Sequence, residues 1–252
     1  MPTAASRAWT PDDPTPRALW DALGRPPAGA VTLVGAGGKP TLAHALAAEA
    51  ADAGARVLLL TTTKMNLEPG LVTDPGEALR ALAPGRVVVG GVPVSETKFG
   101  PFAAADVERL RAAADLVVVE GDGSRRLPFK VPAAYEPVVP AWTDLLLVVA
   151  GLTALGRPLG EVCCRAEAAA ALLSDPDAAA RPLDPPTAAS LLRAGYLDNP
   201  ALTAWAGRRV VVLNQADDPR LGRRGCALAA LLPGERVLLA SNRHPTEPGG
   251  TP

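Results

Sequence analysis

Residues 31–41 read Val-Thr-Leu-Val-Gly-Ala-Gly-Gly-Lys-Pro-Thr, and this stretch decides the fold that the sequence predicts. The apolar run indicates a buried strand, the glycines indicate a tight turn, and the alanine-rich residues that follow indicate a helix. Glycines let successive backbone N–H groups face one anion, and the start of a helix adds positive potential. Gly35, Ala36, Gly37 and Gly38, followed by Lys39, therefore predict a phosphate-binding loop.

This loop departs from the usual order G-x-x-x-x-G-K-[ST]. Leu33 stands where the first glycine is expected, Pro40 stands where a hydroxyl should follow Lys39, and Thr41 comes one position late. The alternative is an ordinary strand–turn–helix junction, with Pro40 at the first helical position, where its missing N–H does no harm. Phosphate binding is favoured because Gly-Gly-Lys after an apolar strand is more specific than a lone G-x-G-x-x-G.

Composition and charge exclude several classes of protein. The 252 residues are 48% hydrophobic and 20% charged, as in a globular domain, and the net charge of −1 gives no basic field for nucleic acid or an anionic membrane. No apolar run approaches the ~20 residues of a membrane span. The first residues lack the apolar core of a secretory signal, and three cysteines are too few for a disulfide framework. We expect a cytoplasmic protein with no nucleic-acid or membrane partner.

Seven short apolar runs alternate with helical patterns along the chain. The runs are continuous, which is typical of parallel strands buried on both faces. The predicted strands are residues 30–34, 56–60, 86–89, 116–119, 145–149, 210–213 and 237–240. The predicted helices are residues 16–23, 41–52, 103–114, 166–173, 186–194 and 221–232. This order predicts an α/β fold with a three-layer, doubly wound, mainly parallel sheet of the P-loop NTPase type, in which ligands bind beyond the carboxyl ends of the strands.

The chain is long enough for one large domain with an appendage. We expect residues 1–16 to form a flexible N-terminal arm and residues 244–252 to form a flexible tail. Residues 17–243 then make a single α/β nucleotide-binding domain. Within it, residues 151–205 show no clear strand and contain proline-rich turns, so we interpret them as a helical insertion that covers one side of the site.

Lysine is rare in this chain, with four of the 25 basic residues: Lys39, Lys64, Lys98 and Lys130. A chain that uses arginine for general charge keeps lysine where a compact ammonium group is needed. All four lie in loop-like stretches near Gly, Thr, Ser or Pro, which favours one shared anion-binding cleft. The alternative is that their positions are a matter of chance.

Polar residues follow two of the predicted strands. Three threonines and Lys64 end the second strand, which suits a phosphate or a carboxylated substrate, although threonine is also simply a good strand former. Glu120 and Asp122 end the fourth strand, the usual place for carboxylates that hold magnesium near a phosphate loop. The alternative for these two is a solvent-facing Asp-Gly turn. Downstream, Ser124, Arg125 and Lys130 are candidates for binding a second, anionic substrate, and a solvated Lys130 is the alternative.

A further polar cluster follows the last two predicted strands. Asn214-Gln215-Ala216-Asp217 has the form of the N-K-x-D element with which GTP-binding proteins recognise guanine, although Gln215 replaces the lysine. Ser241 lies where such a fold places its second base-binding loop. Asn214, Asp217 and Ser241 are therefore candidate base-binding residues.

Cysteine and histidine residues give weaker signals. A thiolate pair at Cys163 and Cys164 could bind a soft metal or carry a transferable sulfur or selenium, but buried small hydrophobic side chains are the favoured interpretation. His44 and His244 are isolated in the sequence, so we assign neither a role.

Five segments together resemble the YqeC family of accessory proteins of selenium-dependent molybdenum hydroxylases. They read G-A-G-G-K-P-T (35–41), T-T-T-K-M (61–65), E-G-D-G-S-R-R-L-P-F-K-V-P-A-A-Y-E-P-V-V-P (120–140), T-D-L-L-L-V-V-A-G-L-T-A-L-G-R-P-L (143–159) and L-N-Q-A-D (213–217). The resemblance covers about residues 31–241. It implies a cytoplasmic, P-loop-like nucleotide-binding protein linked to maturation of a selenium- and molybdenum-containing cofactor, and it supplies no reaction.

Three positions depart from the pattern of that family. Pro40 replaces a threonine whose hydroxyl is expected to reach magnesium or the β-phosphate. Tyr135 and Cys164 each replace a histidine. These departures are expected to weaken magnesium coordination and any histidine-based step.

Two functions follow as hypotheses. In the first, the protein is a P-loop NTPase or an NTP-dependent transferase or ligase that uses Mg²⁺ with ATP or GTP. The loop from Gly35 to Thr41 binds the phosphates, Lys39, Lys64 and Asp122 are the catalytic candidates, and Thr41, Glu120 and Asp122 are the metal candidates. An anionic second substrate or the molybdenum cofactor, and a molybdenum hydroxylase, are the expected partners. In the second, the protein is a non-catalytic carrier or chaperone that binds a nucleotide or a molybdopterin dinucleotide.

Overall fold

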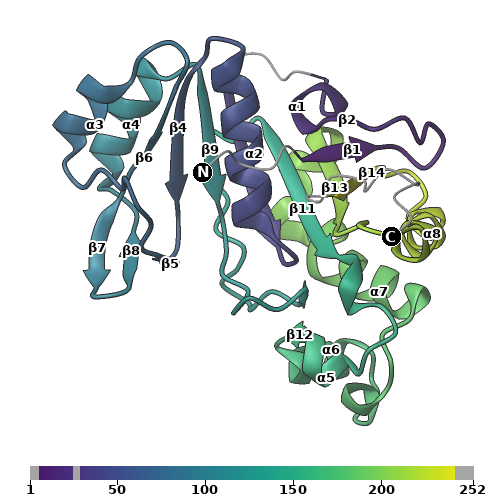
Figure 1. Ribbon diagram of the computed structural model, residues 1–252. Coiled ribbons are helices and arrows are strands. Elements are labelled where there is room, and N and C mark those ends of the chain that lie inside the picture. The colour runs from purple at the N-terminus through teal and green to yellow at the C-terminus, as the bar shows by residue number, and fades with distance from the viewer. Residues whose placement is uncertain (1–5, 25–28, 242–252) are drawn as a thin grey trace, which may run out of the picture.

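The computed structural model describes residues 6–24 and 29–241, and its centre is a nine-stranded, mainly parallel sheet (Figure 1). In spatial order its strands are β2 (Arg17–Ala18), β1 (Arg7–Trp9), β14 (Arg236–Ser241), β13 (Arg209–Asn214), β11 (Leu145–Gly151), β3 (Gly29–Gly35), β9 (Leu116–Glu120), β4 (Arg56–Thr61) and β6 (Arg86–Val89). All seven predicted strands are present and pair in parallel. The predicted α/β class with a mainly parallel sheet is therefore confirmed.

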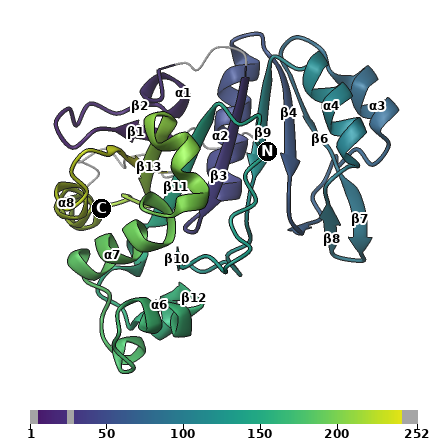
Figure 2. The same ribbon diagram turned by 180° about the vertical axis from the view of Figure 1, so that it is seen from behind.

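Helices cover both faces of this sheet, as Figures 1 and 2 show from opposite sides. They are α1 (Leu19–Ala22), α2 (Lys39–Asp52), α3 (Pro75–Ala81), α4 (Ala104–Ala113), α5 (Leu159–Val162), α6 (Ala166–Leu172), α7 (Pro185–Leu192) and α8 (Pro219–Ala230). Four further helical segments are not α-helical: η1 (Leu152–Ala154), η2 (Ala178–Ala180) and η4 (Pro200–Arg208) are 3-10 helices, and η3 (Arg193–Leu197) is a π-helical turn. In β11, Leu147 packs on the side of α2, and Leu146 packs on the side of α7 and α8. This two-sided burial explains why the strands are continuous apolar runs.

The topology places the site at the carboxyl edge of the sheet. From β3 the chain crosses to β4, β6 and β9 on one side, and it later adds β11, β13 and β14 on the other. The strand order therefore reverses at β3. In open α/β sheets a ligand crevice forms at such a point, beyond the carboxyl ends of the strands. The loops after β3, β9, β11 and β13 all leave at this edge.

The N-terminal segment corrects the prediction of an arm over residues 1–16. Arg7–Trp9 form β1, which pairs antiparallel with β14, and Ala8 is fully buried. Pairing satisfies backbone groups that β14 would otherwise expose at the sheet edge. The helix expected over residues 16–23 is shorter, since β2 occupies Arg17–Ala18 and α1 begins at Leu19. Residues 1–5 and the tail predicted over residues 244–252, which includes His244, lie outside the described residues.

Two small sheets were not predicted. One consists of β5 (Met65–Asn66), β8 (Lys98–Gly100) and β7 (Val92–Ser95), all antiparallel. The other pairs β10 (Phe129–Lys130) with β12 (Cys163–Cys164), so the insertion that we expected to lack strands contains one. Strands of two or three residues are too short to produce a recognisable pattern. In Figure 1 the small sheet of β7 and β8 and the helices α5 and α6 lie toward the same end as the carboxyl edge. No helix in the described ranges is both long and apolar enough for a membrane crossing.

Candidate functional site

The glycine loop between β3 and α2 is fixed against the end of β11. Gly35, Gly37 and Gly38 have φ values of 95°, 91° and 99°, a region that disfavours other residues. A Cβ on Gly35 would lie 2.2 Å from the carbonyl oxygen of Val149, and a Cβ on Gly37 would lie 2.2 Å from the backbone nitrogen of Gly151. Both the backbone conformation and the close approach therefore require glycine at these positions.

Helix α2 begins at Lys39, with Gly38 as its N-cap and Pro40 in its first turn. Proline is well tolerated there because the first N–H groups of a helix have no intrahelical partner. Pro40 and Thr41 are both exposed. The hydroxyl of Thr41, a predicted magnesium ligand, thus lies on the accessible side of the first turn.

Lys39 is buried at the centre of the site, with 1% of its surface exposed. Its ammonium donates to the carbonyl oxygen of Gly35 at 2.6 Å and lies 3.3 Å from Asp122 Oδ1 and 3.7 Å from Glu120 Oε1. A buried cation is costly unless it is paired. The structure thus brings together Lys39, Glu120 and Asp122, three residues that the sequence predicted for one site.

Asp122 links the glycine loop to the segment that follows β9. It accepts the backbone N–H of Gly35 at 3.0 Å, pairs with Lys130 at 2.8 Å and lies 3.5 Å from the hydroxyl of Tyr196. With Lys39 as a fourth partner, its carboxylate oxygens are surrounded by donors. Asp122 was predicted as a catalytic residue and a metal ligand, and its contacts in this structure all hold the protein together.

Lys130 continues this network toward the insertion. Its ammonium has no exposed surface and donates to the carbonyl oxygen of Gly123 at 2.6 Å, while Asp122 and Glu136 each lie at 2.8 Å. Glu136 in turn pairs with Arg165 at 2.8 Å, just before α6. Three acceptors match the three hydrogens of an ammonium group. In this structure Lys130, predicted to bind an anionic substrate, is thus occupied by protein acceptors.

Glu120 has a different environment from Asp122. Its Oε2 atom is buried and has no hydrogen-bond partner. Burial raises the pKa of Glu120; Lys39 opposes this effect, and the negative charges of Asp122 and Glu68 reinforce it. A buried carboxylate oxygen without a donor is costly and calls for an explanation, such as a bound ion. Of the two predicted carboxylates, Glu120 is the one with an oxygen available to a cation.

The predicted base-binding residues lie next to the loop and to each other. Asn214 is fully buried at the end of β13, and its amide nitrogen donates to the carbonyl oxygen of Gly37 at 2.7 Å. The hydroxyl of Ser241, at the end of β14, donates to Asp217 Oδ1 at 2.7 Å. Gln215 between them has a φ of 67° and accepts a hydrogen bond from Thr153 at 2.5 Å. The N-x-x-D segment is therefore anchored to the glycine loop through its asparagine.

The four lysines do not gather into a single cluster. Lys39 and Lys130 both contact Asp122, whereas Lys98 donates to Asn66 at 2.7 Å within the small antiparallel sheet. Lys64 is exposed on the loop after β4, and Arg125 is exposed after β9. Ser124, which precedes Arg125, is partly buried. Three of these predicted substrate-binding or catalytic residues, Lys64, Ser124 and Arg125, thus lie at the accessible side of the carboxyl edge.

The cysteine pair is not suited to nucleophilic chemistry. Both side chains are buried, and burial raises the pKa of Cys163 to about 12. The thiolate is the reactive form, so this thiol is inert near neutral pH. In the described parts of the chain, no group of three or more His, Cys, Asp and Glu side chains could hold a metal ion. The favoured interpretation of these cysteines as buried small hydrophobic residues fits both observations.

Sequence reasoning missed two features of the site. Tyr196 is fully buried in the π-helical turn η3 beside Asp122, and burial, followed by the charge of Asp122, raises its pKa well above 10. No sequence signal marked it, because the contact spans 74 residues. His44 was considered isolated, yet its Nε2 lies 2.7 Å from Glu68 Oε2. The position of His44 on the helix that follows the glycine loop was the signal that could have pointed to a role.

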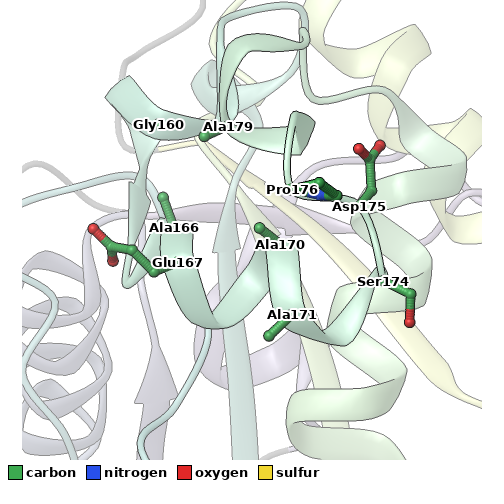
Figure 3. A pocket seen from close by; sticks show the side chains of 9 residues that line it. All are labelled: Gly160, Ala166, Glu167, Ala170, Ala171, Ser174, Asp175, Pro176 and Ala179. Carbon is green, nitrogen blue, oxygen red and sulfur yellow. The ribbon is translucent and has the colours of Figure 1, made fainter.

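A separate cavity of about 560 Å³ lies in the insertion (Figure 3). It is lined mainly by small residues of α6 and of the segment that leads to η2, with Glu167 and Asp175 among them. None of the predicted site residues lines it. The cavity therefore belongs to the insertion and not to the glycine loop.

Comparison with known proteins identifies the family. The family model described as "YqeC protein" matches residues 31–167, which include the glycine loop, Glu120, Asp122, Lys130 and Arg165. An uncharacterized protein YqeC of Escherichia coli (strain K12) is 30% identical over 135 residues, in an alignment that covers 50% of this chain and 53% of that protein. The chain thus spans about half the length of this curated relative. The protein belongs to the YqeC family.

Proposed function

We propose that this protein binds a nucleoside triphosphate with Mg²⁺ through the loop from Gly35 to Thr41, and that it serves the maturation of a selenium-dependent molybdenum hydroxylase or its cofactor. The observation that carries the nucleotide proposal is the position of Lys39. Lys39 is the first residue of α2 and follows three glycines with left-handed backbone conformation. Its ammonium lies close to the carboxylates of Glu120, at the end of β9, and of Asp122, two residues later. The link to selenium and molybdenum, and a cytoplasmic location, rest on family resemblance.

Binding of phosphate requires Lys39 to exchange partners. Its ammonium is bonded to Gly35 and paired with two carboxylates, and an incoming phosphate is an anion that competes with them. The start of α2 supplies N–H groups and positive potential on the same side. When Lys39 turns to the phosphate, Asp122 Oδ1 keeps the backbone N–H of Gly35 and Oδ2 keeps Lys130 and Tyr196, so the exchange leaves neither carboxylate oxygen without a donor.

Magnesium would be held mainly through Glu120. Mg²⁺ in nucleotide sites keeps several waters and uses one or two carboxylates with the phosphates, so a cluster of three protein ligands is not needed. The unpartnered Oε2 of Glu120 fits this role. Bound Mg²⁺ would also offset the repulsion between Glu120 and the phosphates. Thr41 is the remaining candidate because Pro40 supplies no hydroxyl.

Asn214, Asp217 and Ser241 are proposed to bind the base. Asn214 orients the segment because its side chain donates to Gly37. Asp217, at the other end of the segment, accepts from Ser241, and its carboxylate supplies the acceptor for the base. A carboxylate pairs with neighbouring N–H donors, such as those on the Watson–Crick edge of guanine, better than with adenine, whose ring nitrogen on that edge is an acceptor. The acceptor chemistry of Asp217 favours GTP over ATP.

The proposed reaction class is NTP hydrolysis or transfer of a phosphoryl group to an anionic second substrate, which could be the molybdenum cofactor. Phosphoryl transfer needs mainly positioning and charge neutralisation. Lys64, Ser124 and Arg125 are the residues at the accessible edge that can meet such a substrate. A molybdenum hydroxylase is the proposed protein partner.

A second candidate function is a carrier or chaperone that binds a nucleotide or a molybdopterin dinucleotide without turnover. Pro40 in the first turn of α2 favours it, because a missing magnesium ligand affects the transition state more than the ground state.

Calorimetric titration of the wild type with GTP, ATP and CTP, each with and without Mg²⁺, tests the proposal. We expect Mg²⁺-dependent binding that is tightest for GTP, and loss of binding in Lys39→Ala. Asp217→Asn should reduce the preference for GTP, whereas Asp74→Asn, at the exposed N-cap of α3, is the matched control. If the wild type binds none of these nucleotides, or if Lys39→Ala binds as well as the wild type, the proposal is wrong.

Phosphate release over time separates the two candidate functions. Turnover that rises in Pro40→Thr supports an enzyme whose magnesium site is incomplete. Tight binding with no phosphate release in either protein supports the carrier.

A further inference from the structure

His44 and Glu68 form a pair beside the glycine loop that no predicted function uses. His44 lies one turn into α2, and Glu68 follows β5, so the pair ties the loop's helix to the segment that leaves the second strand. The imidazole Nε2 lies 2.7 Å from Glu68 Oε2, and both side chains are partly exposed, at 29% and 22%. On α2, His44 shares a face with Pro40 and Thr41, because residues three and four apart are neighbours on a helix.

Buried polar atoms without hydrogen-bond partners occur in this pair and after the ends of neighbouring strands. Four buried side-chain nitrogen and oxygen atoms in the described residues have no hydrogen-bond partner, and three of them belong to Thr63, Glu68 and Glu120. Thr63 follows β4, Glu68 follows β5, and Glu120 is the last residue of β9. Glu120 is buried beside Lys39; the charge of Glu68 contributes to the raised pKa of Glu120, and the charge of Glu120 contributes to the raised pKa of His44. A carboxylate oxygen only accepts hydrogen bonds, so the unpartnered Oε1 of Glu68 suits a group that carries O–H donors, such as water.

The hydrogen bond to Glu68 also determines the state of His44. A carboxylate that accepts from Nε2 fixes the proton there in the neutral imidazole and leaves Nδ1 as an acceptor. The hydrogen bond with Glu68 raises the pKa of His44, burial opposes this, and the charges of Glu68 and Glu120 add to the rise. An imidazole oriented by a carboxylate is the arrangement of a general base.

We propose that His44 is the proton acceptor for the water that attacks the γ-phosphate, and that Glu68 positions its imidazole. This inference rests on the proposed function of the glycine loop. The water oxygen forms a bond to the γ-phosphorus while the bond from that phosphorus to the β–γ bridging oxygen breaks. The nucleoside diphosphate leaves with the bonding electrons, and the water's proton passes to His44 Nδ1. Phosphate and the nucleoside diphosphate are the products.

The experiment uses the full chain and measures nucleotide affinity and phosphate release separately. Removal of a general base typically costs ~10²–10⁴-fold in rate. His44→Gln should keep GTP affinity within about twofold of the wild type. It should lower the rate of phosphate release by ~10²–10⁴-fold. Asp52→Asn, at the exposed end of the same helix, is the matched control and should change neither quantity.

Chemical rescue and the pH profile identify the role of each residue. Free imidazole should restore part of the phosphate release of His44→Ala and leave that of Lys39→Ala unchanged. Turnover requires neutral His44, so the rate should rise with pH through its pKa. Glu68→Gln should move this rise to lower pH, because the glutamate that raises the pKa of His44 is gone.

The outcomes separate the two proposals. If the wild type binds no nucleotide, the function proposed for the loop fails, and this inference fails with it. If nucleotide binds but His44→Gln releases phosphate as fast as the wild type, or the wild type releases none, the inference alone is overturned.

Discussion

The glycine-loop region and the insertion lie at the same edge of the sheet and use charge in opposite ways. Around the loop, Lys39, Asp122 and Lys130 are almost completely buried, and both lysines pair with Asp122. In the insertion, the ion pairs Arg157–Glu161 and Arg181–Asp175 lie at the surface. Breaking a buried pair leaves an uncompensated charge, whereas exposed pairs contribute little. Substitution of the buried charges around the loop is therefore costly, whereas the surface charges of the insertion can be substituted at little cost.

A single row of alternating charges joins these two regions. It runs from Glu120 through Lys39, Asp122, Lys130 and Glu136 to Arg165 at the start of α6. An anion that draws Lys39 away from Asp122 changes the first links of this row. If the buried row and the insertion surface differ as much as their contacts indicate, substitutions in the two regions should have unequal effects.

The largest effect is expected from Asp122→Ala. The substitution leaves Lys39 and Lys130 without their shared carboxylate in the protein interior, and loss of one partner from a buried pair costs about 3–5 kcal/mol. The free energy of unfolding, measured by urea denaturation, should fall by this amount. Asp175→Ala in the insertion, which removes a partner of the exposed Arg181, should cost about 0–1 kcal/mol. Equal losses in the two variants would contradict the comparison.

Gly37→Ala should have the next largest effect. Its φ of 91° and the approach of Gly151 leave no space for a Cβ. A non-glycine residue in such a conformation costs about 1–3 kcal/mol, and the overlap adds to this. Gly160→Ala is the control in the insertion, where the nearest atom to a Cβ would be 3.1 Å away and φ is not positive. Thermal unfolding should show a clearly smaller shift for the control.

The pH dependence of stability should distinguish Glu136 from Glu120. Burial tends to raise the pKa of Glu136, but hydrogen bonds from Lys130, Ala133 and Arg165 lower it below 4.5. Its contribution is therefore present above pH 4.5 and is lost as pH falls through its lowered pKa. Glu136→Gln should remove part of the stability at pH 7 and flatten the loss in acid.

The pH dependence of stability expected from Glu120 has the opposite sign. Its pKa is raised, so its ionisation reduces stability as pH increases through that pKa. Glu120→Gln should be at least as stable as the wild type at pH 7, measured by urea denaturation over the same pH range as Glu136→Gln. A marked loss of stability at pH 7 would mean that its pairing with Lys39 outweighs its burial.

The smallest effect concerns the cysteines. Cys163 and Cys164 are buried where the insertion meets β10, and Cys226 is exposed on α8. Mass spectrometry after treatment with iodoacetamide at pH 8 should find Cys226 labelled first, with no change in secondary structure. Rapid labelling of Cys163 in the folded protein would show that the insertion opens at this point.

Much of the fold could be predicted from the sequence because its signals are local. Seven continuous apolar runs located the parallel strands, and the segment from Gly35 to Lys39 located the loop and the start of α2. Glu120, Asp122 and Asn214 could be placed near the loop because parallel strands end at one edge. The short strands β1, β5 and β12 could not be predicted, because two or three residues carry no periodicity.

What the sequence by itself determined is therefore the sheet, the loop and the identity of the charges at its edge, since these follow from periodicity and from the conformational freedom of glycine. Only the tertiary structure decided how those charges pair. Lys130 contacts three protein acceptors, Tyr196 contacts Asp122 across 74 residues, and His44 pairs with Glu68. Pairing depends on distances between segments that are remote in the chain, and no local pattern encodes those distances.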